Sequence, residues 1–311
     1  TEPFGKYFKS IGLDAVVGSV GDGVTLRMIS DIQGVTYTEG RLLPYFFPDV
    51  FTEGGDPIGE SKDNWLKARR AILRSPVDRI GYGGYLKLAD EWPGFIDRIS
   101  QVVAEFRQIH ANMQGSQAYT APFKVAVLNS WGNLRRWMAN QVHHALWYRE
   151  IYSYVGVIEA LSGMPIDVEF ITFEEMKQGI DPSIRVIINA GDAYTAFSGG
   201  EVWKDPELVC ALRRFVDEGG GFIGVGEPTA CQYQGRYFQL SDVLGVDREL
   251  GFSMSTDKYN ELNREHFILE DVTGSIDFGE GKSRIYAQGE NYQILDMDGK
   301  YSRLVVNEYG K

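Results

Sequence analysis

The stretch GVTYTEGRLLPYFFPDVF, residues Gly34–Phe51, combines an apolar run with charged and aromatic side chains that crowd together just before Pro48. Its pattern predicts a strand over Val35–Phe47. Parallel α/β proteins place their active-site side chains at the exits of strands, and aromatic faces pack well against the apolar side of a sugar ring. We therefore expect a sugar-binding site at the end of this strand.

Helices and strands are predicted to alternate on both sides of this strand. The predicted elements are a helix over Thr1–Ile11, a strand over Leu13–Val20, a helix from the N-cap Asp22 to Asp31, the Val35–Phe47 strand, a helix over 64–75 capped by Asp63, a strand over Arg79–Leu88 and a helix over Trp92–Asn112. These units lack the GxGxxG phosphate fingerprint. The pattern thus favours the C-terminal part of a (β/α)8 TIM barrel over a Rossmann sheet for residues 1–113.

A second α/β domain is predicted over residues 123–311, after a linker over residues 114–122 that is rich in Gly, Ser, Thr and Ala. Its expected elements are strands at Phe123–Leu128, Asp167–Ile171, Ile184–Ala190 and Gly221–Gly226, with helices at 173–179 after the N-cap Thr172 and at Pro206–Glu218. This alternation favours an open doubly wound sheet. The tail from Ser283 predicts a terminal β-hairpin region with Asp298-Gly299 as its turn.

Composition excludes several function classes. The 311 residues carry a formal charge of -12 without a basic run, which argues against a nucleic-acid surface. The sequence contains no run of about 18 consecutive apolar residues, so it predicts no membrane span. The first residues lack the succession of basic, apolar and small residues that a signal peptide has. The two cysteines are Cys210 and Cys231, so we do not expect a disulfide framework. We expect a cytoplasmic location.

The sequence at both ends predicts that the chain is a piece of a longer protein. The sequence opens at TEPFG without Met, and it stops at VVNEYGK, where a strand enters a turn.

Arg41, Tyr45 and Phe47 are the candidate substrate-binding residues at the strand exit. Arg41 can hold phosphate or sugar hydroxyls with two parallel hydrogen bonds, or it can form a structural ion pair inside the barrel. Tyr45 and Phe47 alternate onto one face, where they can stack on a sugar ring or pack in the core.

Gly21, Asp22 and Gly23 are candidate phosphate-binding residues, since they follow the first predicted strand and open a helix whose free N–H groups favour anions. A tight turn with Asp22 as N-cap is the alternative.

Four segments together resemble the β-galactosyl-(1,3)-N-acetylhexosamine phosphorylases, the lacto-N-biose phosphorylase group of glycoside hydrolase family 112. They are TEPFGKYFKSIGLDAVVGSVGDG, TYTEGRLLPYFFPDVF, VLNSWGNLRRWM and FVDEGGGFIGVGEPTACQY. The resemblance implies the last strands of a catalytic barrel joined to a glutamine-amidotransferase-like α/β domain. It implies inverting phosphorolysis, in which phosphate attacks the galactosyl anomeric carbon to give α-galactose 1-phosphate and free N-acetylhexosamine.

The resemblance also implies that the catalytic acid, an Asp, lies just upstream of Thr1, so that this chain alone is expected to be inactive. One protein carboxyl suffices, because phosphate replaces the activated water of an inverting hydrolase. Inorganic phosphate is then the co-substrate, and no metal or organic cofactor is expected. The partners are a galactosyl-N-acetylhexosamine disaccharide and phosphate, with a homodimer as a further expectation.

Three alternatives remain open. Glu39 could be the nucleophile of a retaining β-galactosidase-like hydrolase. Cys231 with His143 or His144 could form a thiol site, although no elbow motif surrounds the Cys and lone cysteines are usually small core residues. The chain could also be a non-catalytic sugar-binding module. In the second domain, Trp131 and Glu227 are predicted to help cover the sugar site as a lid.

Overall fold

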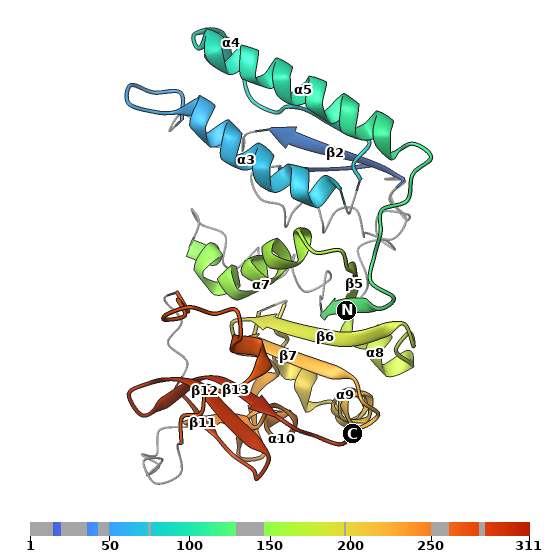
Figure 1. Cartoon of the computed structure of the whole chain (residues 1–311), viewed down its shortest axis with the longest axis vertical. Coiled ribbons are helices and arrows are strands. Elements are labelled where there is room, and N and C mark those ends of the chain that lie inside the picture. The colour runs from blue at the N-terminus through green and yellow to red at the C-terminus, as the bar shows by residue number, and fades with distance from the viewer. Residues whose placement is uncertain are drawn as a thin grey trace. The chain divides into compact units, whose positions relative to one another are not determined.

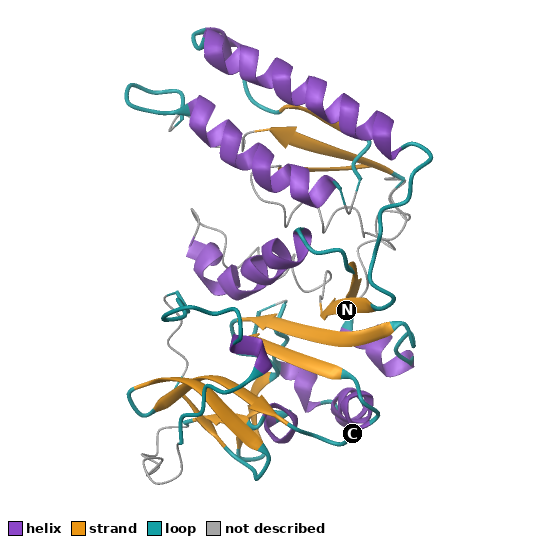
Figure 2. Ribbon diagram, in the orientation of Figure 1, coloured by secondary structure: helices purple, strands orange, loops and turns teal. Residues whose placement is uncertain are grey.

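The computed structural model describes residues 15–19, 36–42, 50–73, 76–128, 146–195, 197–249, 261–279 and 284–311 (Figures 1 and 2). The chain divides into two compact units. We call residues 2–123 with 155–168 the N-terminal unit and residues 124–154 with 169–311 the C-terminal unit. Helices and strands alternate in both, so both are α/β structures. The helices predicted over Thr1–Ile11 and Asp22–Asp31 lie outside the described residues.

A parallel three-stranded sheet with the strand order β1-β2-β3 forms the centre of the N-terminal unit. Its elements are β1 (Ala15–Ser19), β2 (Tyr37–Leu42), α3 (Pro57–Ile72), β3 (Arg79–Tyr82), α4 (Leu86–Asp90) and α5 (Pro93–Met113). Neighbours in the sheet are also neighbours in sequence. A (β/α)8 barrel has this sequential order, whereas a doubly wound sheet reverses its strand order at one point.

The two faces of β2 differ because side chains alternate along a strand. Thr38 and Gly40 are buried, whereas Tyr37 and Arg41 are exposed. α3 and α5 pack against each other and against β2 and β3 (Figure 1). The buried face of β2 therefore lies toward α3 and α5. Tyr37, Glu39 and Arg41 share the other face, which these two helices do not cover and which we call the helix-free face of the described residues.

The two long helices each bury one stripe of apolar side chains, as amphipathic helices that cover a sheet do. In α3 the stripe is Trp65, Ala68 and Ile72. In α5 it contains Phe95, Val102 and Phe106. Between the helices, the Trp65 indole Nε1 donates to Glu105 Oε2 over 2.6 Å, and Arg69 Nη1 donates to Glu105 Oε1 over 2.7 Å.

Two predictions for this unit are wrong in detail. α3 begins at Pro57, and its cap is Asp56, whose Oδ1 accepts from Gly59 N over 2.8 Å; Asp63 is an exposed residue inside the helix. The predicted strand over Arg79–Leu88 ends at Tyr82. Gly83 and Gly84 follow, which have no side chains to pack in a ladder. The Tyr82 hydroxyl then donates to the Tyr85 carbonyl, at the start of α4.

A four-stranded sheet with the order β5-β4-β6-β7 forms the centre of the C-terminal unit. The elements from the first to the last strand of this sheet are β4 (Lys124–Leu128), α7 (Leu146–Ser162), β5 (Asp167–Ile171), α8 (Phe173–Gln178), β6 (Ile184–Gly191), the 3-10 helix η1 (Glu201–Lys204), α9 (Pro206–Asp217) and β7 (Gly221–Gly226). Of these, α7 and β5 contain residues of both units. The pairs β4–β6 and β6–β7 are parallel. The first strand lies between the second and third, which is the reversal of order that defines a doubly wound sheet.

Both faces of the inner strand β4 are buried, whereas Ile223 of the edge strand β7 is 47% exposed. Ala126 and Leu128 of β4 belong to a core with α8 and α9, to which Met176 and Leu212 contribute. Val125 and Val127, which point to the other face, are also buried. The predicted N-cap Thr172 forms a capping box: its Oγ1 accepts from Glu175 N over 3.1 Å, and Glu175 Oε2 accepts from Thr172 N over 2.7 Å.

The rest of the C-terminal unit is an antiparallel sheet with the order β10-β11-β13-β12 and a two-stranded β8-β9 ladder. The elements are β8 (Ala230–Tyr233), β9 (Arg236–Phe238), α10 (Ser241–Leu244), β10 (Val246–Arg248), the 3-10 helix η2 (Phe267–Leu269), β11 (Ile285–Ala287), β12 (Tyr292–Asp298) and β13 (Tyr301–Asn307). The predicted hairpin is present. However, Asp298 pairs with Tyr301, so its turn residues are Gly299 and Lys300 rather than Asp298-Gly299. Gly299 supplies the positive φ of +57° that this tight turn needs.

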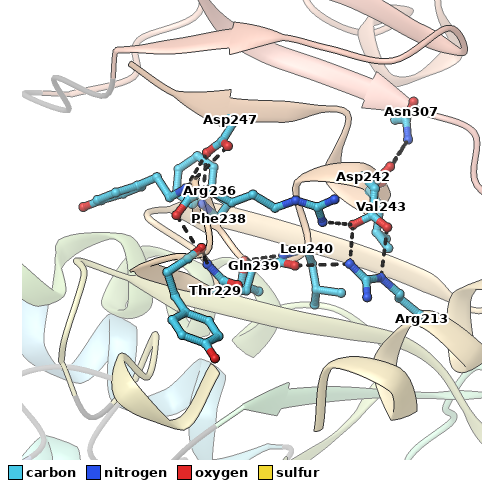
Figure 3. Close-up of polar contacts among 12 residues, drawn as sticks. Arg213, Thr229, Arg236, Phe238, Gln239, Leu240, Asp242, Val243, Asp247 and Asn307 are labelled. Carbon is cyan, nitrogen blue, oxygen red and sulfur yellow. Dashed lines mark hydrogen bonds and ion pairs between the residues drawn. The ribbon is translucent and has the colours of Figure 1, made fainter. Parts of the chain in front are cut away.

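Polar side chains join these strands to the helices of the same unit (Figure 3). Arg213 of α9 donates to both carboxylate oxygens of Asp242 of α10, over 2.9 and 3.0 Å. The side-chain amide of Asn307 in β13 donates to the carbonyls of Asp242 and Val243, over 3.1 Å each. The last strand of the chain is thereby fixed to α10, and α10 to α9.

The cap of α3 gives a first test. Replacing Asp56 with Ala leaves the N–H of Gly59 without its acceptor, and we expect the free energy of unfolding to fall by about 1 kcal/mol. Asp63→Ala, in the exposed helix interior, is the matched control and should change it by less than about 0.5 kcal/mol. Urea titration followed by circular dichroism measures both. Equal losses for the two variants would contradict the observed cap.

Candidate functional site

Three charged side chains gather on the helix-free face of the sheet in the N-terminal unit. In register, Glu39 of β2 lies opposite Arg79 of β3. Glu39 Oε1 lies 3.6 Å from Arg41 Nε, and Glu39 Oε2 lies 3.4 Å from Arg79 Nη1. The carboxylate therefore bridges two arginines, one on its own strand and one on the neighbouring strand. We call Glu39, Arg41 and Arg79 the β2–β3 charge cluster.

The members of the cluster lie at different depths along the sheet. Arg41 is the fifth of the six residues of β2, close to the carboxyl end where parallel α/β proteins hold their ligands. Glu39 is two residues deeper and its side chain is 17% exposed, against 48% for Arg41. Arg79 is the first residue of β3, lies level with Glu39 in the register, and has a side chain that is 66% exposed. Arg41 is therefore the member of the cluster nearest the carboxyl end of the sheet, where a barrel holds its ligands.

Gly83, just after β3, lies against the side chain of Arg41. A Cβ atom added to Gly83 would come within 2.7 Å of Arg41 Cβ and 2.8 Å of Arg41 Cδ. Contacts this short do not occur between carbon atoms, so any side chain at position 83 would push the Arg41 stem aside. The glycine thus lets the two chain segments approach closely.

The start of the β2–β3 pairing is fixed by a second polar contact. Asp78 Oδ2 accepts from the backbone N–H of Thr38 over 2.7 Å and from its hydroxyl over 3.1 Å. The backbone N–H of Asp78 donates to the Thr38 carbonyl over 3.0 Å. These bonds hold the register that places Arg79 opposite Glu39.

Other predicted residues of this unit contribute less to the observed geometry. Phe51, at the end of the stretch Gly34–Phe51, packs in the core, with its ring centroid 5.1 Å from that of Phe95 and 6.3 Å from that of Trp92. The candidate residues that lie outside the described part of the chain are Gly21, Asp22, Gly23, Tyr45, Phe47, Trp131, His143 and His144.

Glu227 follows β7 at the carboxyl end of the parallel sheet in the C-terminal unit. Its Oε2 accepts from Ala193 N over 2.9 Å, and its Oε1 accepts from the Tyr237 hydroxyl over 3.0 Å and from Arg248 Nη1. Arg248 Nη1 also donates to the Tyr237 hydroxyl over 2.7 Å, and its guanidinium lies 4.7 Å from the centre of the Tyr237 ring. Glu227 is therefore part of a polar network within its own unit.

Burial governs the protonation of this network. It raises the pKa of Tyr237 to about 12, and the adjacent Glu227 carboxylate acts in the same direction. The phenol therefore stays protonated and donates to Glu227. Burial also raises the pKa of Asp247. Its Oδ1 accepts from the N–H of Phe238 over 3.0 Å (Figure 3), and from those of Tyr237 and Arg248 over 3.1 and 2.7 Å.

The thiol alternative receives no support from the surroundings of Cys231. Its side chain is 0% exposed and belongs to the core of the C-terminal unit. Burial raises the pKa of the thiol, which opposes formation of the nucleophilic thiolate. In the described ranges, no group of three or more His, Cys, Asp or Glu side chains could hold a metal ion. Among the same residues, no helix is long and apolar enough to cross a membrane.

Sequence reasoning missed Arg79, Tyr237 and Arg248. Arg79 opens a predicted strand, so its position was available, but its partner depends on the β2–β3 register. Tyr237 and Arg248 lie on β9 and β10, short strands of three residues each. Runs this short carry too little periodicity to predict a strand.

The fold and the charge cluster define the chain as a two-unit α/β protein whose first unit has the strand order of a barrel. Family models identify it further. Residues 1–121 match the model described as the lacto-N-biose phosphorylase N-terminal TIM barrel domain, and residues 124–311 match the lacto-N-biose phosphorylase central domain. The chain therefore belongs to the lacto-N-biose phosphorylase family, as the resemblance predicted.

Curated relatives match the whole chain. Two are the 1,3-β-galactosyl-N-acetylhexosamine phosphorylases Cphy3030 and Cphy0577 of Lachnoclostridium phytofermentans, at 61% and 57% identity. Another is the 1,3-β-galactosyl-N-acetylhexosamine phosphorylase of Bifidobacterium longum subsp. longum, at 49% identity. Each alignment covers 100% of this chain but only 43%, 43% and 46% of the respective relative. The chain thus spans less than half the length of these relatives.

The raised pKa of Tyr237 gives a pH-dependence test. A tyrosine with a folded-state pKa of about 12 against an ordinary value of 10.0 stabilises the fold below pH 10, and that stability is lost as the pH rises toward 12. In Tyr237→Phe we expect the free energy of unfolding, measured by urea titration, to fall less between pH 9 and pH 12 than it does in the unsubstituted protein. Tyr119→Phe, which removes an exposed hydroxyl, is the control and keeps the wild-type pH dependence. An unchanged dependence in Tyr237→Phe would contradict the assignment.

Proposed function

We propose that the protein carrying this chain is an inverting phosphorylase. It converts β-galactosyl-(1,3)-N-acetylhexosamine and inorganic phosphate to α-galactose 1-phosphate and free N-acetylhexosamine. The names of relatives at 49–61% identity over the whole chain support the reaction. The observation that carries the proposal in the structure is Arg41, a half-exposed arginine near the carboxyl end of β2 on the helix-free face. In a (β/α)8 barrel that face lines the interior, and the carboxyl end holds the active site.

Arg41 is proposed to bind phosphate or galactosyl hydroxyls. Glu39 contacts Nε, at one edge of the planar guanidinium. The opposite edge carries the Nη1 and Nη2 groups, whose parallel N–H bonds match two oxygens of a phosphate. Tyr45 and Phe47 are proposed to stack on the galactose ring, and Gly21, Asp22 and Gly23 to contact phosphate through backbone N–H groups.

The chemistry needs one protein carboxyl group, which protonates the leaving oxygen while phosphate attacks from the opposite face. We propose that this general acid is an Asp upstream of Thr1, as the family resemblance implies. On this proposal the 311-residue chain binds substrate through one wall of the site and does not turn it over alone. Phosphate is the co-substrate, and no metal or organic cofactor takes part.

The retaining alternative assigns the nucleophile to Glu39. Its carboxylate oxygens, however, each face a guanidinium, at 3.6 and 3.4 Å, and its side chain is 17% exposed. A carboxylate held between two cations is a weaker nucleophile and is poorly placed to reach an anomeric carbon. The geometry therefore favours the phosphorylase over the retaining hydrolase. A non-catalytic sugar-binding module remains the alternative outside enzymes.

The C-terminal unit is proposed to be glutamine-amidotransferase-like, which its strand order β5-β4-β6-β7 supports. The predicted covering of the sugar site by Trp131 and Glu227 stays a prediction, as does the homodimer. A cytoplasmic location is also proposed, supported by the low cysteine content.

The proposal is tested by the products of the protein that carries this chain at the length of its relatives. Galactose 1-phosphate should form from lacto-N-biose or galacto-N-biose only when phosphate is present. Release of free galactose without phosphate would contradict the proposal and support a hydrolase.

Substitution of Arg41 tests the site. In that protein, Arg41→Ala should lower kcat/KM for phosphate or for the disaccharide by about 10²- to 10³-fold, because a charged anchor of the reacting groups is lost. Arg107→Ala, an exposed arginine on α5, is the matched control and should leave the kinetics unchanged. Arg41→Ala with wild-type kinetics and an unchanged melting temperature would show that the site is assigned wrongly.

A further inference from the structure

The β2–β3 charge cluster assigns a task to Glu39 beyond those considered above. We propose that Glu39 is a positioning residue for Arg41, which orients the guanidinium toward the substrate and itself touches neither phosphate nor sugar. This inference rests on the proposed function, because it supposes that Arg41 binds a reactant.

The first argument is the pattern of contacts. Glu39 directs Oε1 to Nε of Arg41 and Oε2 to Nη1 of Arg79. An arginine has several rotatable bonds, and a carboxylate 3.6 Å from Nε, an ion pair longer than a hydrogen bond, favours orientations of the guanidinium that direct the Nη1 and Nη2 edge away. A contact to an Nη group would instead have occupied the edge that grips an oxyanion.

The second argument is the balance of charge. The cluster contains two guanidinium groups and one carboxylate, so one positive charge remains. Arg79 holds the second oxygen of Glu39 from the neighbouring strand, and the register Glu39↔Arg79 fixes its place. The carboxylate is thus held from two sides, and the cluster as a whole stays positive. A net positive site of this kind retains its attraction for phosphate.

The third argument is the packing of the Arg41 stem. Gly83 approaches Arg41 so closely that an added Cβ would lie 2.7 Å from Arg41 Cβ and 2.8 Å from Cδ. Gly83 does not have the positive φ that would by itself call for glycine. Space for Arg41 is therefore the reason for a glycine here. Glu39 holds the head of the arginine and Gly83 accommodates its stem, so the side chain is preorganised for binding.

The test is a double-mutant cycle in the protein that carries this chain at the length of its relatives, with phosphate as the varied reactant. Glu39→Gln keeps the shape of the side chain and removes its charge. We expect kcat/KM for phosphate to fall about 10- to 100-fold, mainly through KM, since a misplaced binding group loses about this much. In the Arg41→Ala background, the same substitution should cost less than about twofold, because its partner is already absent.

Two further variants keep the test decisive. Glu105→Gln, which removes an equivalent carboxylate from Arg69 on the helix side of the same unit, is the matched control and should change KM less than about twofold. Gly83→Ala retains every charge and displaces the Arg41 stem. It should raise KM for phosphate about tenfold in the wild-type background and have no effect in Arg41→Ala. This variant decides the question if Glu39→Gln fails to fold, as judged by its melting temperature.

The outcomes separate the inference from the proposed function. Losses from Glu39→Gln that are the same with and without Arg41, or wild-type kinetics in Glu39→Gln, would overturn the positioning role while phosphorolysis by the unsubstituted protein still stands. A near-complete loss of kcat in both backgrounds would overturn it too, in favour of a nucleophilic Glu39. Absence of any phosphate-dependent reaction in the unsubstituted protein would instead remove the proposed function.

Discussion

The contact of one carboxylate with two guanidinium groups is the interaction on which the candidate site depends. Glu39 joins Arg41 on β2 to Arg79 on β3, across a pairing whose register is fixed by Thr38 and Asp78. Because residues alternate along a strand, Thr38 and Gly40 bury one face of β2 against the helices while Glu39 and Arg41 share the other. Without this ion pair, the arginine near the strand exit would be a flexible side chain rather than an oriented one.

A second polar centre organises the C-terminal unit. Asp247 accepts backbone N–H groups from β9, and Glu227 accepts from Tyr237, Arg248 and the backbone of Ala193. Partly buried carboxylates of this kind need several hydrogen-bond donors, because a charged group that loses its water without gaining such donors destabilises the fold. The network connects the carboxyl end of the parallel sheet with the short strands β9 and β10. It gives Glu227 a structural task, whether or not the residue also lines a sugar site.

Much of the fold could be predicted from the sequence. The strands at Asp167–Ile171 and Gly221–Gly226 were predicted with the bounds that the structure has, since each is a short run containing β-branched and aromatic residues next to turn residues. The sequence signals for where an element begins or ends were wrong at α3 and β3. Asp56 rather than Asp63 caps α3, because the helix begins earlier, at Pro57. Gly83 and Gly84 end β3 before Leu88, although the sequence RIGYGGYLKL reads as one strand.

The candidate site was only partly within reach of the sequence. Arg41 could be proposed from its place before an aromatic run, and both of its predicted tasks, ligand binding and an ion pair, fit the geometry. That its partner is Glu39, and that Arg79 completes the cluster, depends on strand alternation and on inter-strand register, which a single sequence does not encode locally. The fit of Gly83 against Arg41 likewise became visible only in three dimensions.

The anomeric configuration of the first sugar phosphate formed by the protein at the length of its relatives tests the central claim most directly. Proton NMR of the reaction in phosphate buffer reports this configuration, because the phosphate ester at the anomeric carbon prevents mutarotation of the product. With Glu39 holding Arg41 and phosphate attacking directly, the product is α-galactose 1-phosphate. Formation of β-galactose 1-phosphate would show a covalent intermediate, and would contradict the account by restoring a nucleophile to the site.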